Sequence, residues 1–173
     1  MSTATGTAVL PGSELYGRIH QFLNIEAELL DTYKFADWLE CFTPDIEYRM
    51  PVRTTQFLTD GEGFNEFELM SENMASLTTR VRRLETEFAW AETPPSRTRH
   101  FVSNVLVDES GDGTLSVRSS FLITRTRQDL DYQMFTGVRH DLMHREGDTF
   151  KISRRKILVD QTVITATNLS VLF

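Results

Sequence analysis

The chain has 173 residues, of which 40% are hydrophobic and twelve are Phe, so it is long and apolar enough to bury a core without disulfides or metals. A net charge of -7 and a pI near 5.1 argue against unspecific attraction to nucleic acid or an anionic membrane surface. No stretch approaches the roughly 20 apolar residues that span a bilayer, and the N-terminus does not resemble a secretory signal. A single cysteine excludes an internal disulfide and favours a reducing compartment, so we expect a soluble, cytoplasmic protein.

The first part of the chain predicts helices after a short lead-in. Residues 1–12 are mostly small and polar and end at Pro-Gly, which predicts a flexible lead-in before a single domain over residues 13–173. Ser13 suits an N-cap, and the apolar residues after it recur every three or four positions, as in a helix that buries one face. A second, shorter helix is predicted around the apolar residues Phe35, Trp38, Leu39 and Phe42.

The pattern changes after this second helix, whose cap candidates are Asp31 and Thr32 and which we expect to end at residues 43–45, Thr-Pro-Asp. Alternating apolar residues then predict a half-buried strand through Tyr48, and residues 53–64 are polar and predict a loop. A third helix is centred on Met74, Leu77, Val81, Leu84 and Phe88.

The remainder of the chain, after a double proline, predicts strands. Apolar and polar residues alternate over residues 97–108, 114–127, 132–144 and 150–159, and short polar turns join these runs. Such runs form an antiparallel meander. Helices followed by a meander predict an α+β fold in which the helices cover one face of the sheet.

Metal binding and nucleophilic catalysis find little support in the pattern. His140 and His144 are four positions apart in a predicted strand, which separates them by roughly 13 Å, too far to share one ion. Cys41 lies among large apolar residues and is expected to act as a small buried hydrophobe. We therefore expect no metal site in this chain.

General acid–base catalysis is the one enzymatic function for which the sequence offers candidate residues. Asp45, Tyr48 and His100 lie at predicted strand starts, where they are able to converge on a pocket between the helices and the sheet. The alternative is that Tyr48 belongs to the core and His100 makes a local hydrogen bond.

Two further features suggest contacts with another chain. Arginines gather after the double proline and again at residues 154–156, and Arg is enriched at interfaces because it binds carboxylates with two hydrogen bonds. The C-terminal run, residues 163–173, is apolar although chain ends are normally polar. We expect it to form either a strand of the sheet or part of a subunit contact.

Three segments carry a resemblance to a known family. They are FLNIEAELLDTYKFADWLECFTPDIEYRMPVR from Phe22, WAETPPSRTRHFVSNV from Trp90 and RRKILVDQTVITATNLSVLF from Arg154. Together they resemble, in the same order and over most of the chain, the small β subunits of Rieske-type aromatic-ring-hydroxylating dioxygenases. The match is weaker over residues 54–85.

The resemblance implies a cone-shaped fold like nuclear transport factor 2, with N-terminal helices packed on a strongly bent, largely antiparallel sheet. It also implies a structural subunit without cofactors that assembles with a larger catalytic α subunit, commonly as an α3β3 hexamer. The α subunit of such enzymes holds the Rieske [2Fe-2S] cluster and the mononuclear non-haem iron. The assembled enzyme converts aromatic hydrocarbons to cis-dihydrodiols with O2 and with NADH-derived electrons that pass through a reductase and usually a ferredoxin.

The family motifs also contain the residues that we expect to contact the α subunit. These are Trp90, Arg97, Arg99, His100, Arg154, Arg155 and Asp160. The same motifs equally suit internal packing of a tight corner. Two other functions remain open: a stand-alone dehydratase or isomerase of the same fold that uses Asp45, Tyr48 and His100, and a non-enzymatic homodimer that binds a small ligand.

Overall fold

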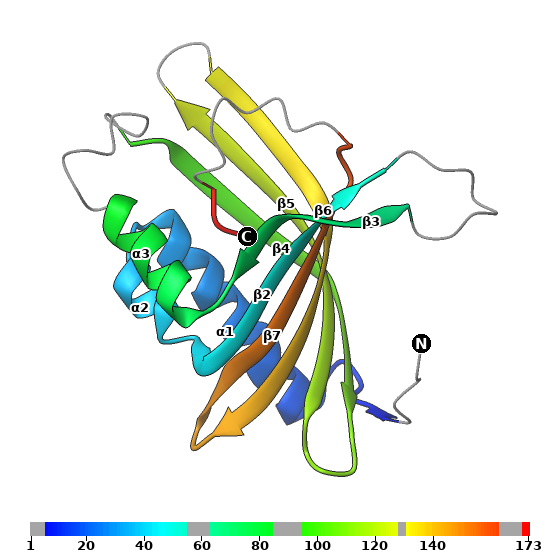
Figure 1. The fold of residues 1–173 in the computed structure, drawn as a ribbon. Coiled ribbons are helices and arrows are strands. Elements are labelled where there is room, and N and C mark those ends of the chain that lie inside the picture. The colour runs from blue at the N-terminus through cyan, green and yellow to red at the C-terminus, as the bar shows by residue number, and fades with distance from the viewer. Residues whose placement is uncertain (1–5, 55–62, 85–94, 128–130, 163–170) are drawn as a thin grey trace.

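The computed structural model describes residues 6–54, 63–84, 95–127, 131–162 and 171–173. Its helices are α1 (Glu14–Asp31), α2 (Phe35–Leu39) and α3 (Met74–Leu84). Its strands are β1 (Thr7–Ala8), β2 (Phe42–Arg53), β3 (Phe64–Glu72), β4 (Arg97–Glu109), β5 (Leu115–Arg127), β6 (Asp131–Glu146) and β7 (Thr149–Val159). The helices gather on one side of a single sheet (Figure 1), so the predicted α+β architecture is confirmed.

The described strands form one sheet in the order β1-β4-β5-β6-β7-β2-β3. The predicted meander is confirmed, because β4, β5, β6 and β7 follow one another as antiparallel neighbours. Strand β2 then lies parallel to β7 and antiparallel to β3. β1 pairs with the end of β4 and lies within the segment that we expected to be a lead-in.

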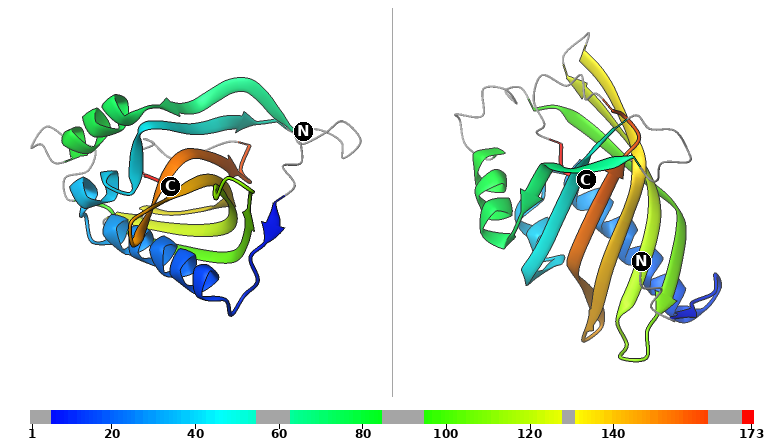
Figure 2. Two further views of the ribbon diagram at one scale, coloured as in Figure 1. Left: turned by 90° about the horizontal axis from the view of Figure 1, so that it is seen from below. Right: turned by 45° about the vertical axis from the view of Figure 1, so that its right-hand side comes forward.

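The sheet is strongly curved, and α1 lies along the open side of the resulting trough (Figure 2). Part of the curvature has a local cause in β4, where the register with β5 shifts between Ser103 and Leu106. Asn104, inside this bulge, has a left-handed φ of 51°, which asparagine tolerates better than most residues. Gly137 on β6 is required for close packing, because a Cβ there would lie 2.2 Å from the Leu158 carbonyl oxygen.

The helices bear out most of the sequence-based expectations. Ser13 caps α1, since its Oγ accepts a hydrogen bond from the Tyr16 amide (3.3 Å). The second helix was predicted too long, because it ends at Leu39 and the chain enters β2 at Phe42. Its expected side-chain cap was wrong, because the N-cap is Lys34 and makes no side-chain cap hydrogen bond.

Two other expectations need correction. Strand β3 was not predicted. The end of the chain forms neither a sheet strand nor an exposed contact surface in its described part, because residues 171–173 lie at most 3% exposed inside the chain's own core. Of the expected third helix, Phe88 lies outside the described residues.

Candidate functional site

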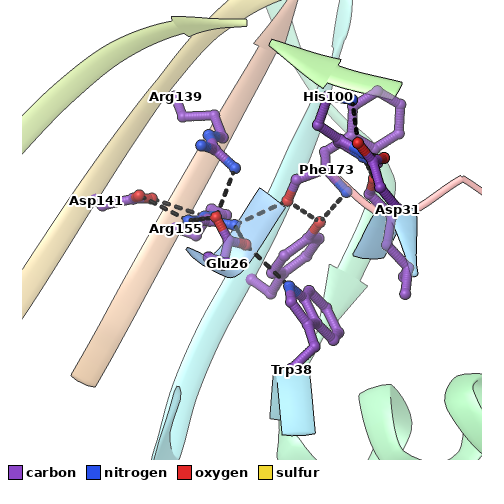
Figure 3. Close-up of polar contacts among 10 residues, drawn as sticks. Glu26, Asp31, Trp38, His100, Arg139, Asp141, Arg155 and Phe173 are labelled. Atoms are coloured by element: carbon purple, nitrogen blue, oxygen red, sulfur yellow. Dashed lines mark hydrogen bonds and ion pairs between the residues drawn. The ribbon is translucent and has the colours of Figure 1, made fainter. Parts of the chain in front are cut away.

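A cluster of four charged side chains is buried between α1 and the sheet (Figure 3). Arg155 of β7 donates two parallel hydrogen bonds to Asp141 of β6, both of 2.8 Å, and a third of 2.6 Å to Glu26 of α1. Arg139 donates to the other Glu26 oxygen (3.1 Å), and the Trp38 indole of α2 donates to Glu26 as well (2.9 Å). The cluster therefore ties both N-terminal helices to the centre of the sheet.

Each charge in this ion cluster has an opposite charge beside it, which makes its burial possible. Burial acts to raise the pKa of Glu26, but the charges of Arg155 and Arg139 and the hydrogen bonds from Arg155 and Trp38 outweigh it and lower that pKa to about 2. Burial likewise acts to lower the pKa of Arg155, and the carboxylates of Asp141 and Glu26 raise it well above its usual value. Glu26 and Arg155 are thus ionised at neutral pH.

The low pKa of Glu26 predicts a loss of stability in acid. A carboxylate whose pKa is lowered in the folded state stabilises that state fully above its unfolded pKa, near 4.5, and loses the effect as the pH falls through the folded pKa. The shift to about 2 corresponds to about 3 kcal/mol. We expect the unfolding free energies of the wild type and of Glu26→Gln to converge by this amount between pH 5 and pH 2 in urea titrations. Parallel curves over that range would contradict the assignment.

The C-terminal residue of the sequence, Phe173, is held directly on this cluster. Its main-chain oxygen accepts hydrogen bonds from Arg155 (2.9 Å) and from the Tyr48 hydroxyl (2.8 Å), and its amide donates to the same hydroxyl (2.9 Å). Its ring packs edge-on against Phe121 and Phe135, with centroids 5.8 Å and 5.6 Å away. Burial raises the pKa of Tyr48 to about 12, so this residue stays a neutral phenol.

A second polar contact lies beside Phe173, between His100 of β4 and Asp31 at the end of α1. His100 Nδ1 lies 2.6 Å from Asp31 Oδ1, and the His100 amide donates to the other oxygen (3.0 Å). Burial acts to raise the pKa of Asp31, but the hydrogen bonds from His100 and the nearby charge of Arg99 outweigh it, so this pKa is lowered overall. The second ring nitrogen, Nε2, lies 3.0 Å from the Leu172 carbonyl oxygen, so both nitrogens of His100 have partners.

His100 lines a cavity of about 270 Å³ between the helices and β4. The apolar lining comes from Leu30, Tyr33, Phe35, Leu84, Pro95, Val171 and Leu172. Its polar lining comes from Ser96, Thr98, His100 and Arg125. Of the three residues considered for acid–base catalysis, only His100 lines this cavity.

The other two lie elsewhere. Asp45 is exposed on β2, where a hydrogen bond from the Thr43 side chain contributes most to a lowered pKa. Tyr48 is fully buried and bonded to Phe173, as expected from the core alternative. The structure therefore does not bring Asp45, Tyr48 and His100 together in one pocket.

The expected contact residues divide between the two faces of the sheet. Arg97, Arg99, Arg154 and Asp160 are exposed, whereas His100 and Arg155 point inward and Trp90 lies outside the described residues. Three of the exposed residues form ion pairs within the chain: Arg99 with Asp31 (3.5 Å), Arg154 with Glu47 (3.1 Å) and Asp160 with Arg53 (3.7 Å).

Metal ligands do not gather in the described part of the chain. Among those residues, no group of three or more His, Cys, Asp or Glu side chains is placed to hold a metal ion. A Rieske cluster needs two cysteines, and the sequence has only Cys41, whose pKa burial raises to about 12. These residues do not fit an iron–sulfur cluster. Within the described ranges, no helix is long and apolar enough to cross a membrane.

The acidic half of the ion cluster and Arg139 were not predicted from the sequence. A signal was present, because Arg139 and Asp141 share their alternation phase with the apolar residues Phe135 and Met143 of β6. Such charged residues at inward positions predict a buried ion pair. The position of Glu26 on the apolar stripe of α1 gives the same indication.

Comparisons with known proteins agree with this architecture. Residues 25–166 match the family described as the ring hydroxylating beta subunit. The beta subunit of biphenyl 2,3-dioxygenase from Rhodococcus jostii (strain RHA1) is 36% identical over 166 residues, which cover 92% of this chain and 89% of that protein.

Solved structures show the same fold. A chain of naphthalene 1,2-dioxygenase with bound indole superposes with a TM-score of 0.82 at 22% identity, covering 95% of this chain and 89% of that one. The beta subunit of benzoate 1,2-dioxygenase from Burkholderia mallei gives a TM-score of 0.66 at 24% identity, covering 82% and 88%. The cone-shaped fold like nuclear transport factor 2, expected from the resemblance, is confirmed.

These matches define a component of an oxidoreductase complex that acts on aromatic rings. The chain belongs to the family of ring-hydroxylating dioxygenase β subunits. Membership of this family implies a multisubunit enzyme in which an α subunit is the partner of this chain.

Proposed function

We propose that this chain is a metal-free, non-catalytic subunit that holds catalytic α subunits together in a three-plus-three hexamer. The α subunit of that assembly holds the Rieske [2Fe-2S] cluster and the mononuclear iron. It receives NADH-derived electrons through a reductase and a ferredoxin in the cytoplasm, where NADH is available. The assembled oxygenase converts aromatic hydrocarbons to cis-dihydrodiols with O2. The relatives are named for biphenyl, naphthalene and benzoate, which share an aromatic ring.

One observation carries the non-catalytic part of this proposal: the interior of the curved sheet is occupied by the chain's own groups. The ion cluster around Arg155 and the ring of Phe173 occupy the centre, where Arg155 bonds to Glu26, to Asp141 and to Phe173. In the cavity beside them, both ring nitrogens of His100 already have partners, Asp31 and Leu172. A general base needs a ring nitrogen within reach of a substrate, and His100 offers none in this arrangement.

The exposed arginines at the start of β4 are our candidates for the contact with the α subunit. Arg97 and Arg99 point outward beside the exposed ring of Phe101, which is 54% accessible. Arginine and aromatic side chains together are characteristic of interface centres. Arg154 and Asp160 lie on the same outer face, on β7 and just after it, and belong to the same proposal.

Charge reversal tests this contact and the structural role together. We expect Arg97→Glu/Arg99→Glu, co-expressed with its α subunit, to lower the fraction of hexamer by about tenfold in size-exclusion chromatography, because the new carboxylates repel the acidic partner groups. Turnover per iron in the hexamer that remains should be unchanged.

The matched control is Lys34→Glu/Arg82→Glu, which reverses two exposed charges on the helical side of the molecule. It should assemble like the wild type. Full assembly of the Arg97/Arg99 variant would remove these residues from the interface. Normal assembly with lost turnover would contradict the non-catalytic role.

A further inference from the structure

The cavity of about 270 Å³ between the helices and β4 is large enough to hold a small molecule. An apolar cavity of roughly 150 Å³ already suffices for benzene, so this one has space for a molecule of one or two rings. Its apolar walls come from separate parts of the chain: the segment after α1 gives Tyr33, α2 gives Phe35, the end of α3 gives Leu84, and the C-terminal residues give Leu172. The proposed function assigns no ligand to this cavity.

Polar groups of the lining are engaged within the chain. The Tyr33 hydroxyl donates to the Ser96 carbonyl oxygen (3.0 Å), and the Thr98 hydroxyl donates to Asp31 (3.2 Å). Both ring nitrogens of His100 have partners as well. A polar group that enters such a cavity loses its contact with water without gaining an equivalent partner, which is unfavourable. The lining therefore selects an apolar molecule.

Arg125 of β5 favours an aromatic occupant over a saturated one. Its side chain lines the cavity, is 1% exposed, and donates a hydrogen bond to Gln133 (3.0 Å). A guanidinium attracts the face of an aromatic ring, most strongly away from water, and this attraction leaves the hydrogen bonds of the arginine in place. The rings of Tyr33 and Phe35, which meet edge-on with centroids 6.2 Å apart, add aromatic contacts on the helical side.

The backbone at Tyr33 supports a role for its ring. Tyr33 follows Thr32, the C-cap of α1, and has a left-handed φ of 60°. Glycine is the usual residue at this position, because a side chain is strained there. Strain of this kind at a bulky residue points to a function of its side chain. The ring in the cavity wall is what tyrosine provides and glycine does not.

We propose that this cavity binds a small, neutral aromatic molecule of one or two rings, in contact with the rings of Tyr33 and Phe35 and with the guanidinium of Arg125. The site binds its ligand and does no chemistry on it, since the ring nitrogens of His100 are engaged. The inference goes beyond the proposed function and concerns this chain alone. It is therefore tested without the α subunit, so that the catalytic site of the assembled enzyme does not enter the measurement.

The test is a titration of the full-length chain with naphthalene, followed through the NMR signals of Tyr33 and Leu172. We expect saturable shifts with a dissociation constant at or below about 0.1 mM, as for about ten enclosed non-hydrogen atoms. Decalin, the saturated molecule with the same carbon skeleton, should bind at least about threefold more weakly, and Arg125→Met should remove most of this difference. The anion 2-naphthoate should also bind more weakly, because its carboxylate has to leave water.

Variants of the cavity wall locate the site. Tyr33→Gly relieves the strained backbone and removes the ring, so it should weaken naphthalene binding at least about fivefold with little change in melting temperature. Leu84→Trp should fill the cavity and abolish binding. Thr79→Trp, the matched control, adds the same side chain at an exposed position of α3 and should bind like the wild type.

Several results would contradict the inference. Absence of saturable shifts overturns it, and so does wild-type affinity in Leu84→Trp. Equal binding of decalin and naphthalene overturns the preference for an aromatic ring, and tighter binding of 2-naphthoate overturns the neutral charge of the ligand. Unchanged binding in Tyr33→Gly overturns the role of that ring. None of these results bears on whether the chain assembles with an α subunit.

Discussion

Arg155→Met is expected to lower the free energy of unfolding by about 3–5 kcal/mol, because it leaves two buried carboxylates without their main counter-charge. Arg155 is fully buried and provides the contacts of both Glu26 and Asp141, as well as one hydrogen bond to Phe173. Methionine fills much of the same volume, so the loss reports the charges and hydrogen bonds. Urea unfolding of the isolated subunit, followed by tryptophan fluorescence, measures it.

Two variants serve as controls for this result. Arg154→Met removes the neighbouring arginine of β7, whose ion pair with Glu47 is more than half exposed on both sides, and should cost at most about 1 kcal/mol. Arg155→Lys keeps the charge but loses the two parallel hydrogen bonds to Asp141, so it should lie between the wild type and Arg155→Met. Equal losses for Arg154→Met and Arg155→Met would show that the ion cluster has no special role in stability.

Phe173→Ala is expected to cost about 3–5 kcal/mol, as for other fully buried phenylalanines whose removal leaves a cavity. The ring is completely buried against Phe121 and Phe135. The main-chain hydrogen bonds to Tyr48 and Arg155 do not depend on the side chain, so the substitution isolates the packing contribution. Chemical denaturation at neutral pH gives the value.

The comparison for this variant is Phe67→Ala, which removes a phenylalanine that is 77% exposed on β3. Its effect should stay within about 0.5 kcal/mol. If Phe173→Ala has an equally small effect, the C-terminal residues do not belong to the stabilising core. That result would also contradict the proposal that the chain's own groups fill the interior of the curved sheet.

The strands of the meander were predictable because one face of each is buried. In β5, for example, Leu115, Val117, Phe121 and Ile123 alternate with less buried residues. The residues of β3 give no such signal, since its Phe67 and Leu69 are exposed while Met70 is buried. An edge strand of this kind is defined by pairing with β2 and not by its own periodicity.

The second helix shows how helical spacing can mislead. Trp38 and Phe42 are four positions apart, as on one helical face, and their rings do meet edge-on with centroids 4.7 Å apart. That contact instead joins the end of α2 to the start of β2. Pro44 is tolerated in β2 because the pairing with β7 is interrupted between Phe42 and Glu47.

The candidate site was less predictable because its partners are distant in sequence. The apolar C-terminus indicated burial, but only the folded chain shows that Phe173 enters the trough beside Arg155. The cluster of basic residues at positions 154–156 indicated a contact with another chain. In the strand, however, Arg155 points inward and its two neighbours point outward.

The central claim, that this chain serves an aromatic-ring dioxygenase as its non-catalytic assembly subunit, is tested most directly by tagging it in its native host and purifying what accompanies it. We expect one peak that contains a larger, brown, iron-containing polypeptide in equal number, with ring hydroxylation by that complex when it is supplied with electrons. A stable, colourless form of this chain alone would show that it is not such a subunit.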